Sequence, residues 1–199
     1  MAKKAASGLA IFIGLFVLVG FLLPASFSVS RSQVIKATPE VVFAQVNDVK
    51  KSQAWSPWAA ADPSMKIELG EILAGVGASY SWTSEDMGAG TLTIKQSTPP
   101  TKIVNEWAQS GGGGGLGTWM FETIEGGTKA TWTMSSDAGM NIVQRYFGLM
   151  MDGMLGGLFE DGLDRLAKIA EATPAPEPPA AKAPEGEPAA GEPADGEKG

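Results

Sequence analysis

The sequence contains no histidine and no cysteine among its 199 residues. Without cysteine there is no disulfide and no thiol nucleophile, and the usual Cys/His zinc and iron–sulfur sites are excluded. The absence of histidine excludes a Ser-His-Asp triad and any imidazole acid or base. Basic residues are also few: 15 Lys and Arg stand against 22 Asp and Glu, a net charge of -7, which argues against a nucleic-acid-binding protein. We expect no metal and no other cofactor.

The first of three compositional zones, residues 1–25, combines Lys3 and Lys4 with an uncharged apolar run at 9–23. With its tolerated flanks the run covers residues 5–25, about 31 Å as a helix, which matches a hydrocarbon core of about 30 Å. We therefore expect one transmembrane helix that anchors the protein in the cell membrane. Lys3 and Lys4 favour a cytoplasmic N-terminus, which places the following domain outside the cytoplasm.

A cleaved signal peptide is the main alternative for this zone, because basic, apolar and small residues follow one another in that order. Ser26 and Ser28 offer small residues at the two positions that a signal peptidase reads. Against cleavage, the run is at the long end for a signal peptide, and residues 27–35 already resemble a strand. A helix buried in a globular core is the third and least favoured interpretation.

The last zone, residues 173–199, consists mainly of Pro, Ala, Gly and Glu and has no aromatic or large aliphatic side chain. Such a segment cannot bury enough apolar surface to offset the entropy lost on ordering. The composition predicts a disordered, solvated spacer.

The central zone, residues 26–172, has the patterns of a folded domain. It begins with strand-like alternation at 26–36, and Thr38, Pro39 and Glu40 then provide an N-cap, an N1 proline and an acidic first turn for a helix. Period-two patterns separated by turn residues predict six further strands, arranged as an antiparallel meander. These strands are 65–72, 78–83, 91–96, 102–108, 117–124 and 128–134. The period then becomes helical over 141–172, with one broad apolar face.

Glycines mark two unusual places in this zone. Five consecutive glycines at 111–115 precede a strand rather than a helix, so they predict a flexible hairpin and not a phosphate-binding loop. Further glycines interrupt the long helix, including Gly156 and Gly157. Since each costs roughly 1 kcal/mol relative to Ala in a helix interior, we expect either a kink or a close backbone approach there.

Seven segments of the domain form a familiar combination. They are FSVSRS at 27–32, ATPEVVFA at 37–44, WSPW at 55–58, DPSMK at 62–66, GVGASYSW at 75–82, TKATWTM at 128–134 and FEDGLDRL at 159–166. With the order of elements, they resemble the START-related helix-grip proteins of the polyketide cyclase/dehydrase and lipid-transport group, also called SRPBCC proteins. The resemblance covers residues 26–172. It implies an α+β fold in which a curved, antiparallel seven-stranded sheet wraps around the long C-terminal helix and leaves an apolar cavity between them.

Tryptophans and their aromatic neighbours are the main candidate binding residues. Alternation places Tyr80 with Trp82, Trp119 with Phe121, and Trp132 with Met134, each pair on one face of its strand. If these faces turn toward the long helix, they line the cavity opposite its Phe and Met side chains, with Trp55 and Trp58 at the mouth. The predicted ligand-binding residues are Trp55, Trp58, Tyr80, Trp82, Trp119, Phe121, Trp132, Met134, Phe147, Met151 and Met154. Ordinary core packing is the alternative for each.

Acid–base catalysis has one weak candidate, Glu106, in the middle of a predicted strand. An apolar setting would raise the pKa of its carboxyl group. An outward-facing carboxylate on a solvated sheet face is the simpler interpretation. No pair of carboxylates stands at a readable spacing.

Three functions follow as hypotheses. The favoured one is a membrane-tethered, non-catalytic carrier or sensor for a lipid or other hydrophobic small molecule. A cyclase or dehydratase that uses the same cavity is held back by the missing histidine and the unpaired carboxylates. The third is a membrane-anchored interaction protein whose cavity is filled by its own side chains. An open apolar cavity favours the carrier, an open cavity beside Glu106 favours the enzyme, and a filled one favours the interaction protein.

Overall fold

The computed structural model describes residues 2–174, with side chains at residue 8 and from residue 10 onward, and the predicted tail at 175–199 lies outside the described residues. Along the chain the elements are α1 (Ala2–Leu22), β1 (Ser26–Ile35), α2 (Pro39–Asn47), α3 (Val49–Ser52), α4 (Pro57–Ala61), β2 (Lys66–Leu69), β3 (Ser79–Ser84), β4 (Gly88–Thr98), β5 (Lys102–Gln109), β6 (Gly114–Ile124), β7 (Gly127–Asp137) and α5 (Ile142–Ala172).

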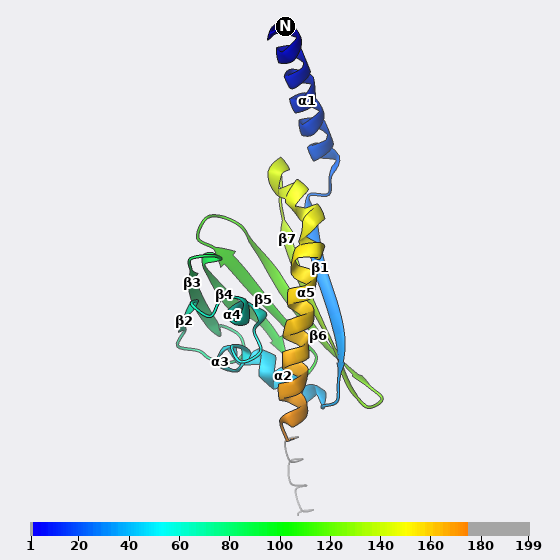
Figure 1. Cartoon of the computed structure of the whole chain (residues 1–199). Helices are drawn as coiled ribbons and strands as arrows, with labels where there is room; N and C mark the ends of the chain where they lie inside the picture. Colours follow the sequence, from blue (N-terminus) through cyan, green and yellow to red (C-terminus); the bar gives the residue numbers. More distant parts are fainter. Residues whose placement is uncertain (1, 175–199) are drawn as a thin grey trace, which may run out of the picture.

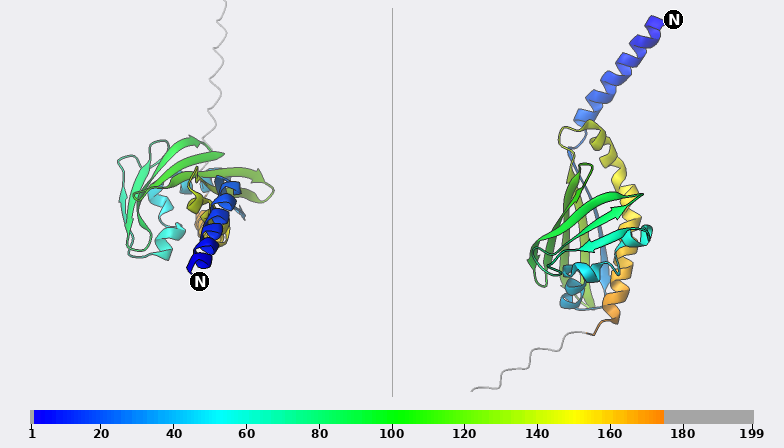
Figure 2. Two further views of the ribbon diagram at one scale, coloured as in Figure 1. Left: turned by 90° about the horizontal axis from the view of Figure 1, so that it is seen from above. Right: turned by 90° about the vertical axis from the view of Figure 1, so that its left-hand side faces the viewer.

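The seven strands form one antiparallel sheet in the order β1-β7-β6-β5-β4-β3-β2, so β2 to β7 are a meander and β1 adds beside β7. The sheet curves around α5, which lies along its β1–β7 side, and the short helices α2 to α4 cover another part of the same face (Figures 1 and 2). The α+β class, the seven strands and the closing helix are confirmed, and the arrangement fits a helix-grip fold.

Two predicted boundaries are wrong. The strand predicted at 65–72 ends at Leu69, because the chain then turns to α2 and α3, where the Val49 N–H donates to the Leu73 carbonyl at 2.8 Å. Within the glycine run, Gly114 and Gly115 belong to β6 and are not part of a loose hairpin. A Cβ on Gly115 would overlap the backbone of Ser135 on β7, so only glycine lets the two strands pair this closely.

The predicted helix at 141–172 is α5, and Asn141 caps it by accepting a hydrogen bond from the Gln144 N–H at 3.1 Å. The helix runs without a break over 31 residues. Its glycines lie where neighbouring chain approaches closely: Gly148 meets Phe27, Gly156 meets Arg31, and Gly162 meets Pro57 and Trp132. Close approach therefore accounts for these three positions.

A stack of aromatic rings joins the sheet to α5. The Trp132 ring lies parallel to Phe159 at a centroid distance of 4.0 Å, and parallel to Trp119 at 4.7 Å. Trp55 meets both tryptophans edge-on, at 5.3 and 6.1 Å. Such ring contacts add to the free energy of burial. They fix the C-terminal half of α5 in the core, where Phe159, Leu163, Leu166 and Ala170 are fully or almost fully buried.

The N-terminal half of α5 does not continue this packing. Val143, Phe147, Met150 and Met154 recur at helical spacing and are all more than half exposed. The single apolar face predicted for the whole helix is therefore wrong for this half, since part of it is an exposed apolar stripe. We call these four residues the α5 stripe.

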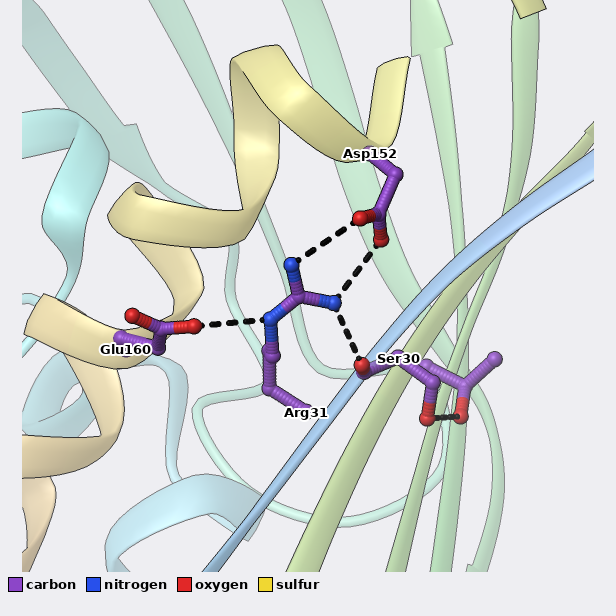
Figure 3. A network of polar contacts seen from close by, with 5 residues as sticks. Ser30, Arg31, Asp152 and Glu160 are labelled. Carbon is purple, nitrogen blue, oxygen red and sulfur yellow. Dashed lines mark hydrogen bonds and ion pairs between the residues drawn. The ribbon is translucent and has the colours of Figure 1, made fainter. Parts of the chain in front are cut away.

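Arg31 of β1 holds the N-terminal half of α5 to the edge of the sheet (Figure 3). Its Nη1 and Nη2 donate to the two carboxylate oxygens of Asp152 at 2.8 and 3.2 Å, and its Nε donates to Glu160 at 2.9 Å. Gly156 lies between the two acids on α5, and a Cβ there would overlap the guanidinium group. The hydrogen bond from Arg31 lowers the pKa of the Asp152 carboxyl group.

Helix α1 projects from the domain beside the start of α5 (Figures 1 and 2). The Tyr146 ring stacks on Phe16 at 4.4 Å, and its hydroxyl donates to the Phe16 carbonyl at 2.8 Å. Arg145 Nη1 donates to the carbonyls of Phe21 and Leu23, which lie at the end of α1. Over the described part of the chain, no helix is both long and apolar enough to cross a membrane. The transmembrane helix expected at 9–23 is not confirmed.

Removing the ring that links α5 to the sheet should destabilise the protein strongly. We expect Phe159→Ala to lower the free energy of unfolding by about 3–5 kcal/mol, because it empties a fully buried site against Trp132. The control Phe147→Ala, in the α5 stripe, should change it by less than about 0.5 kcal/mol. Urea denaturation of the whole chain, followed by tryptophan fluorescence, measures both. Equal losses would contradict this account of the core.

The Arg31 cluster should make stability depend on pH in a defined direction. Since the folded pKa of Asp152 is lowered, its contribution is fully present above the unfolded value of about 3.9 and is lost as the pH falls through the folded pKa. We expect Asp152→Asn to be less stable than the parent at neutral pH, and the difference to shrink in acid. Urea midpoints measured from neutral pH down to about pH 2 test this.

The matched control for this titration is Glu122→Gln. Glu122 pairs with Lys129 at 3.7 Å, a longer contact than the bidentate one between Arg31 and Asp152, and such single surface pairs contribute little to stability. Its midpoint should follow that of the parent. A difference between the parent and Asp152→Asn that stays constant over the whole pH range would show that Arg31 does not stabilise the fold through this carboxylate.

Candidate functional site

A cavity of about 440 Å³ lies between the concave face of the sheet and α5, and Ser56 and Trp58 from the α3–α4 region close part of it. Its volume is within the usual range for small-molecule sites, about 300–1,000 Å³. The lining residues are Gln53, Ser56, Trp58, Met65, Ile67, Tyr80, Trp82, Asp86, Met87, Leu92, Asn105, Trp107, Gln109, Gly117, Trp132, Met134, Met151 and Leu155. Most are aromatic, aliphatic or methionine side chains, so the site suits an apolar ligand.

The register of the strands explains the shape of the cavity. Tyr80, Leu92 and Trp107 are direct neighbours on β3, β4 and β5, and their large side chains form one row of the wall. Glycines take part in the neighbouring pairs: Gly90 pairs with Trp82 and also faces Gln109 on β5, and Gly117 pairs with Asn105. A Cβ on Gly90 would overlap the Trp82 ring. The glycines thus let the Trp82 ring and the Asn105 side chain lie close against the neighbouring strands, as parts of the cavity wall.

The polar groups of the wall are uncharged. Asn105 is buried, with 9% of its surface exposed, and its amide makes no hydrogen bond to any described residue. The Trp107 indole Nε1 is buried and, among the described residues, also lacks a partner. Burial raises the pKa of the Tyr80 hydroxyl to about 12, so the phenol stays neutral at physiological pH.

Charged groups lie at or outside the edge of the site. Asp86, in the β3–β4 turn, is the one carboxylate among the lining residues, and it is solvent-exposed. Glu106 is not part of the lining: its side chain is exposed and pairs with Lys95 at 2.9 Å on the other face of the sheet from Asn105 and Trp107. Among residues 2–174 there is no cluster of acidic side chains that resembles a metal site.

Six of the eleven predicted binding residues line this cavity. They are Trp58, Tyr80, Trp82, Trp132, Met134 and Met151. They come from α4, β3, β7 and α5, so the fold brings together residues that are far apart in the sequence.

Three other predicted residues belong to the core instead. Trp55 and Trp119 wall only a void of about 50 Å³, and the Trp55 indole N–H donates to the Gln45 carbonyl at 3.1 Å. Phe121 meets Phe43 of α2 edge-on at 5.7 Å. The reason is that α2 packs over β5, β6 and β7 and fills this part of the concave face.

Phe147 and Met154 are also outside the cavity, with 54% and 56% of their surfaces exposed. Of the α5 residues, only Met151 and Leu155 are in the lining. Met154 is turned by about 100° from Leu155 on the helix. Phe147 lies one turn closer to the N-terminus of α5 than Met151, where α5 no longer contributes to the lining. Both residues are part of the α5 stripe.

Sequence reasoning missed much of β5 as a cavity wall. Asn105, Trp107 and Gln109 alternate along this strand and all face the site. A signal was available, because an outward-facing Glu106 requires Asn105 and Trp107 to point inward. Met65 and Ile67 were also missed, although they alternate within the strand predicted at 65–72, whereas Met87 lies in a turn, where period two gives no guide.

Solved structures share this fold. Protein CV1439 from Chromobacterium violaceum has a TM-score of 0.56 and 15% sequence identity, over 74% of this chain and 99% of that one. Protein SA2116 of unknown function from Staphylococcus aureus has a TM-score of 0.55 and 14% identity, over 73% and 94%. The di-domain ARO/CYC StfQ from the steffimycin biosynthetic pathway has a TM-score of 0.52 and 13% identity, over 74% of this chain and 51% of that one.

No curated protein matches this sequence. A family profile does match it over residues 26–171, from the first strand to the end of α5. That profile describes polyketide cyclases/dehydrases and lipid-transport proteins. The match includes every strand of the sheet and every cavity-lining residue, and the fold agrees with it. The chain therefore belongs to the polyketide cyclase/dehydrase and lipid-transport family.

Proposed function

We propose that this protein is a membrane-tethered, non-catalytic carrier or sensor that holds a lipid or other hydrophobic small molecule in the cavity between the sheet and α5. The observation that supports this most is the open cavity of about 440 Å³ with a mostly apolar wall. Sites of this kind bind apolar molecules and use a few polar groups for orientation.

The cyclase alternative has one observation in its favour. StfQ and BexL, two structures with the same fold, are described as di-domain ARO/CYC proteins of biosynthetic pathways. In this chain, however, the one weak candidate for acid–base catalysis, Glu106, is exposed and outside the cavity. A general acid or base must lie within hydrogen-bond reach of its substrate. The carrier is therefore the better-supported proposal.

The interaction-protein alternative requires a cavity that the protein fills itself. The wall of the cavity is only half buried at Tyr80, Trp82, Trp107 and Met151. Side chains that filled the site would be packed on all sides, as Trp119 and Phe159 are in the neighbouring core. The open space thus favours a ligand over self-packing.

The proposal of a membrane tether is supported by exposed apolar surface at one end of the molecule. Apolar side chains of α1, including Phe12 and Leu18, are exposed, and so is the α5 stripe. The end of α1 lies beside the start of α5 (Figure 1). Large exposed apolar surfaces of this kind mark sites of protein or membrane contact. In our proposal the segment at 9–23 inserts in the cell membrane, with the N-terminus in the cytoplasm and the domain outside it.

Substitutions at Met151 should separate an open site from a packed core. Met151→Ala should lower the free energy of unfolding by less than the about 2–5 kcal/mol typical of a buried site, because the neighbouring space is already open. Met151→Trp should be tolerated but should displace an environment-sensitive apolar dye. The control Met150→Trp changes the adjacent, exposed residue and should leave dye binding intact. Failure of the parent protein to bind any dye would refute the carrier.

Charges within the apolar run should detach the protein from membranes. We expect the parent to stay in the membrane pellet at alkaline pH, and Leu15→Lys combined with Leu18→Lys to release it, since each lysine costs about 2.5–3.5 kcal/mol at the centre of a membrane helix. Gly8→Lys, at the edge of the run, is the control and should remain in the pellet. Release of a product that begins near Val29 would support cleavage instead.

A further inference from the structure

Asn105 is the most unusual residue of the cavity wall. It lies in the middle of β5, on the concave face, and nine-tenths of its surface is buried. Its side-chain amide carries two donors and an acceptor, yet it makes no hydrogen bond to any described residue. The amide is accessible from the cavity, so its donors and acceptor are free to bind another molecule that enters the site.

The strand next to β5 makes room for this amide. Gly117 of β6 pairs directly with Asn105, and the three atoms nearest to a Cβ on Gly117 would be Oδ1, Cγ and Nδ2 of Asn105. The absence of a side chain at Gly117 therefore leaves room for the Asn105 amide at the floor of the cavity. Met134 is the next residue in the same row, on β7, and it is also part of the lining.

The charges around the cavity indicate what kind of molecule would satisfy the amide. Among the described lining residues there is no lysine or arginine, and the exposed Asp86 adds a negative charge at the edge. An anionic headgroup would lose its hydration without gaining a cationic partner, which is costly. The other polar groups of the wall, Tyr80 and Trp107, are uncharged hydrogen-bond donors.

We propose that the ligand is an uncharged apolar molecule whose carbonyl or hydroxyl oxygen is hydrogen-bonded by the Asn105 amide. This inference rests on the proposed function, because it requires a ligand in the cavity, and it adds the chemical class. It excludes free fatty acids and other anions as the preferred ligands. Gly117 is a positioning residue for this contact, because its lack of a side chain leaves room for the amide.

Three probes of nearly the same shape test the proposal: acetylnaphthalene, isopropenylnaphthalene and naphthoate, substituted at the same ring position. They differ in presenting a neutral carbonyl, no oxygen, or a carboxylate. Each is titrated into the whole chain in one detergent, for the parent, Asn105→Leu and Gly117→Ala. Because partition of each probe into detergent is the same for every variant, it cancels when the affinities of variants are compared.

We expect the ratio of the acetylnaphthalene affinity to the isopropenylnaphthalene affinity to be about fivefold or more higher in the parent than in Asn105→Leu, consistent with one net hydrogen bond. Naphthoate should bind weakest. In Asn105→Leu the preference for the carbonyl should disappear while isopropenylnaphthalene still binds, and in Gly117→Ala it should fall. The melting temperature of unliganded Asn105→Leu should not decrease, since the amide has no protein partner to lose.

Two results would overturn the inference while leaving the carrier proposal in place. One is an equal carbonyl preference in the parent and Asn105→Leu, and the other is tightest binding of naphthoate. If none of the three probes binds the parent, the proposed function fails and this inference fails with it. If Asn105→Leu does not fold, the carbonyl preference of Gly117→Ala tests the inference instead, because that variant keeps the amide and only displaces it. An unchanged preference in Gly117→Ala would then overturn the inference.

Discussion

The contact between Trp132 and Phe159 determines where α5 crosses the sheet, and the rest of the domain depends on it. The two rings lie parallel at 4.0 Å, and Trp119 extends the stack across β6. With the C-terminal half of α5 fixed in this way, the N-terminal half lies over a part of the sheet that α2 does not cover. The cavity forms in that remaining space, with Met151 and Leu155 on its helical side.

The N-terminal half of α5 is held by polar contacts rather than by a core. Arg31 binds Asp152 and Glu160 on either side of Gly156, and Arg145 and Tyr146 bind the end of α1. Charge-assisted hydrogen bonds of this type are directional and position the helix without filling the space beneath it. A cavity wall can therefore be placed accurately and still leave the site open.

In the proposed function the site holds a molecule and does not transform it. The wall contributes aromatic and methionine surface, a neutral phenol and an amide, while Glu106 and Lys95 pair on the opposite face. A binding site needs shape and a few polar contacts, whereas a catalytic site also needs groups that exchange protons near the operating pH. The proposal for Asn105 follows the same logic, because a cavity whose described lining has no lysine or arginine disfavours anionic ligands.

The sequence by itself determined the meander of the six later strands, the start of α5 at Asn141 and six of the cavity residues, because alternation, caps and turns are local properties of the chain, whereas the pairing of β1 with β7 is seen only in the structure. It did not separate Trp82 in the cavity from Trp119 in the core, because both alternate in the same way along their strands. That difference depends on which part of the concave face α2 fills and on glycines in neighbouring strands. Only the tertiary structure decides this, since available volume depends on residues far apart in the sequence.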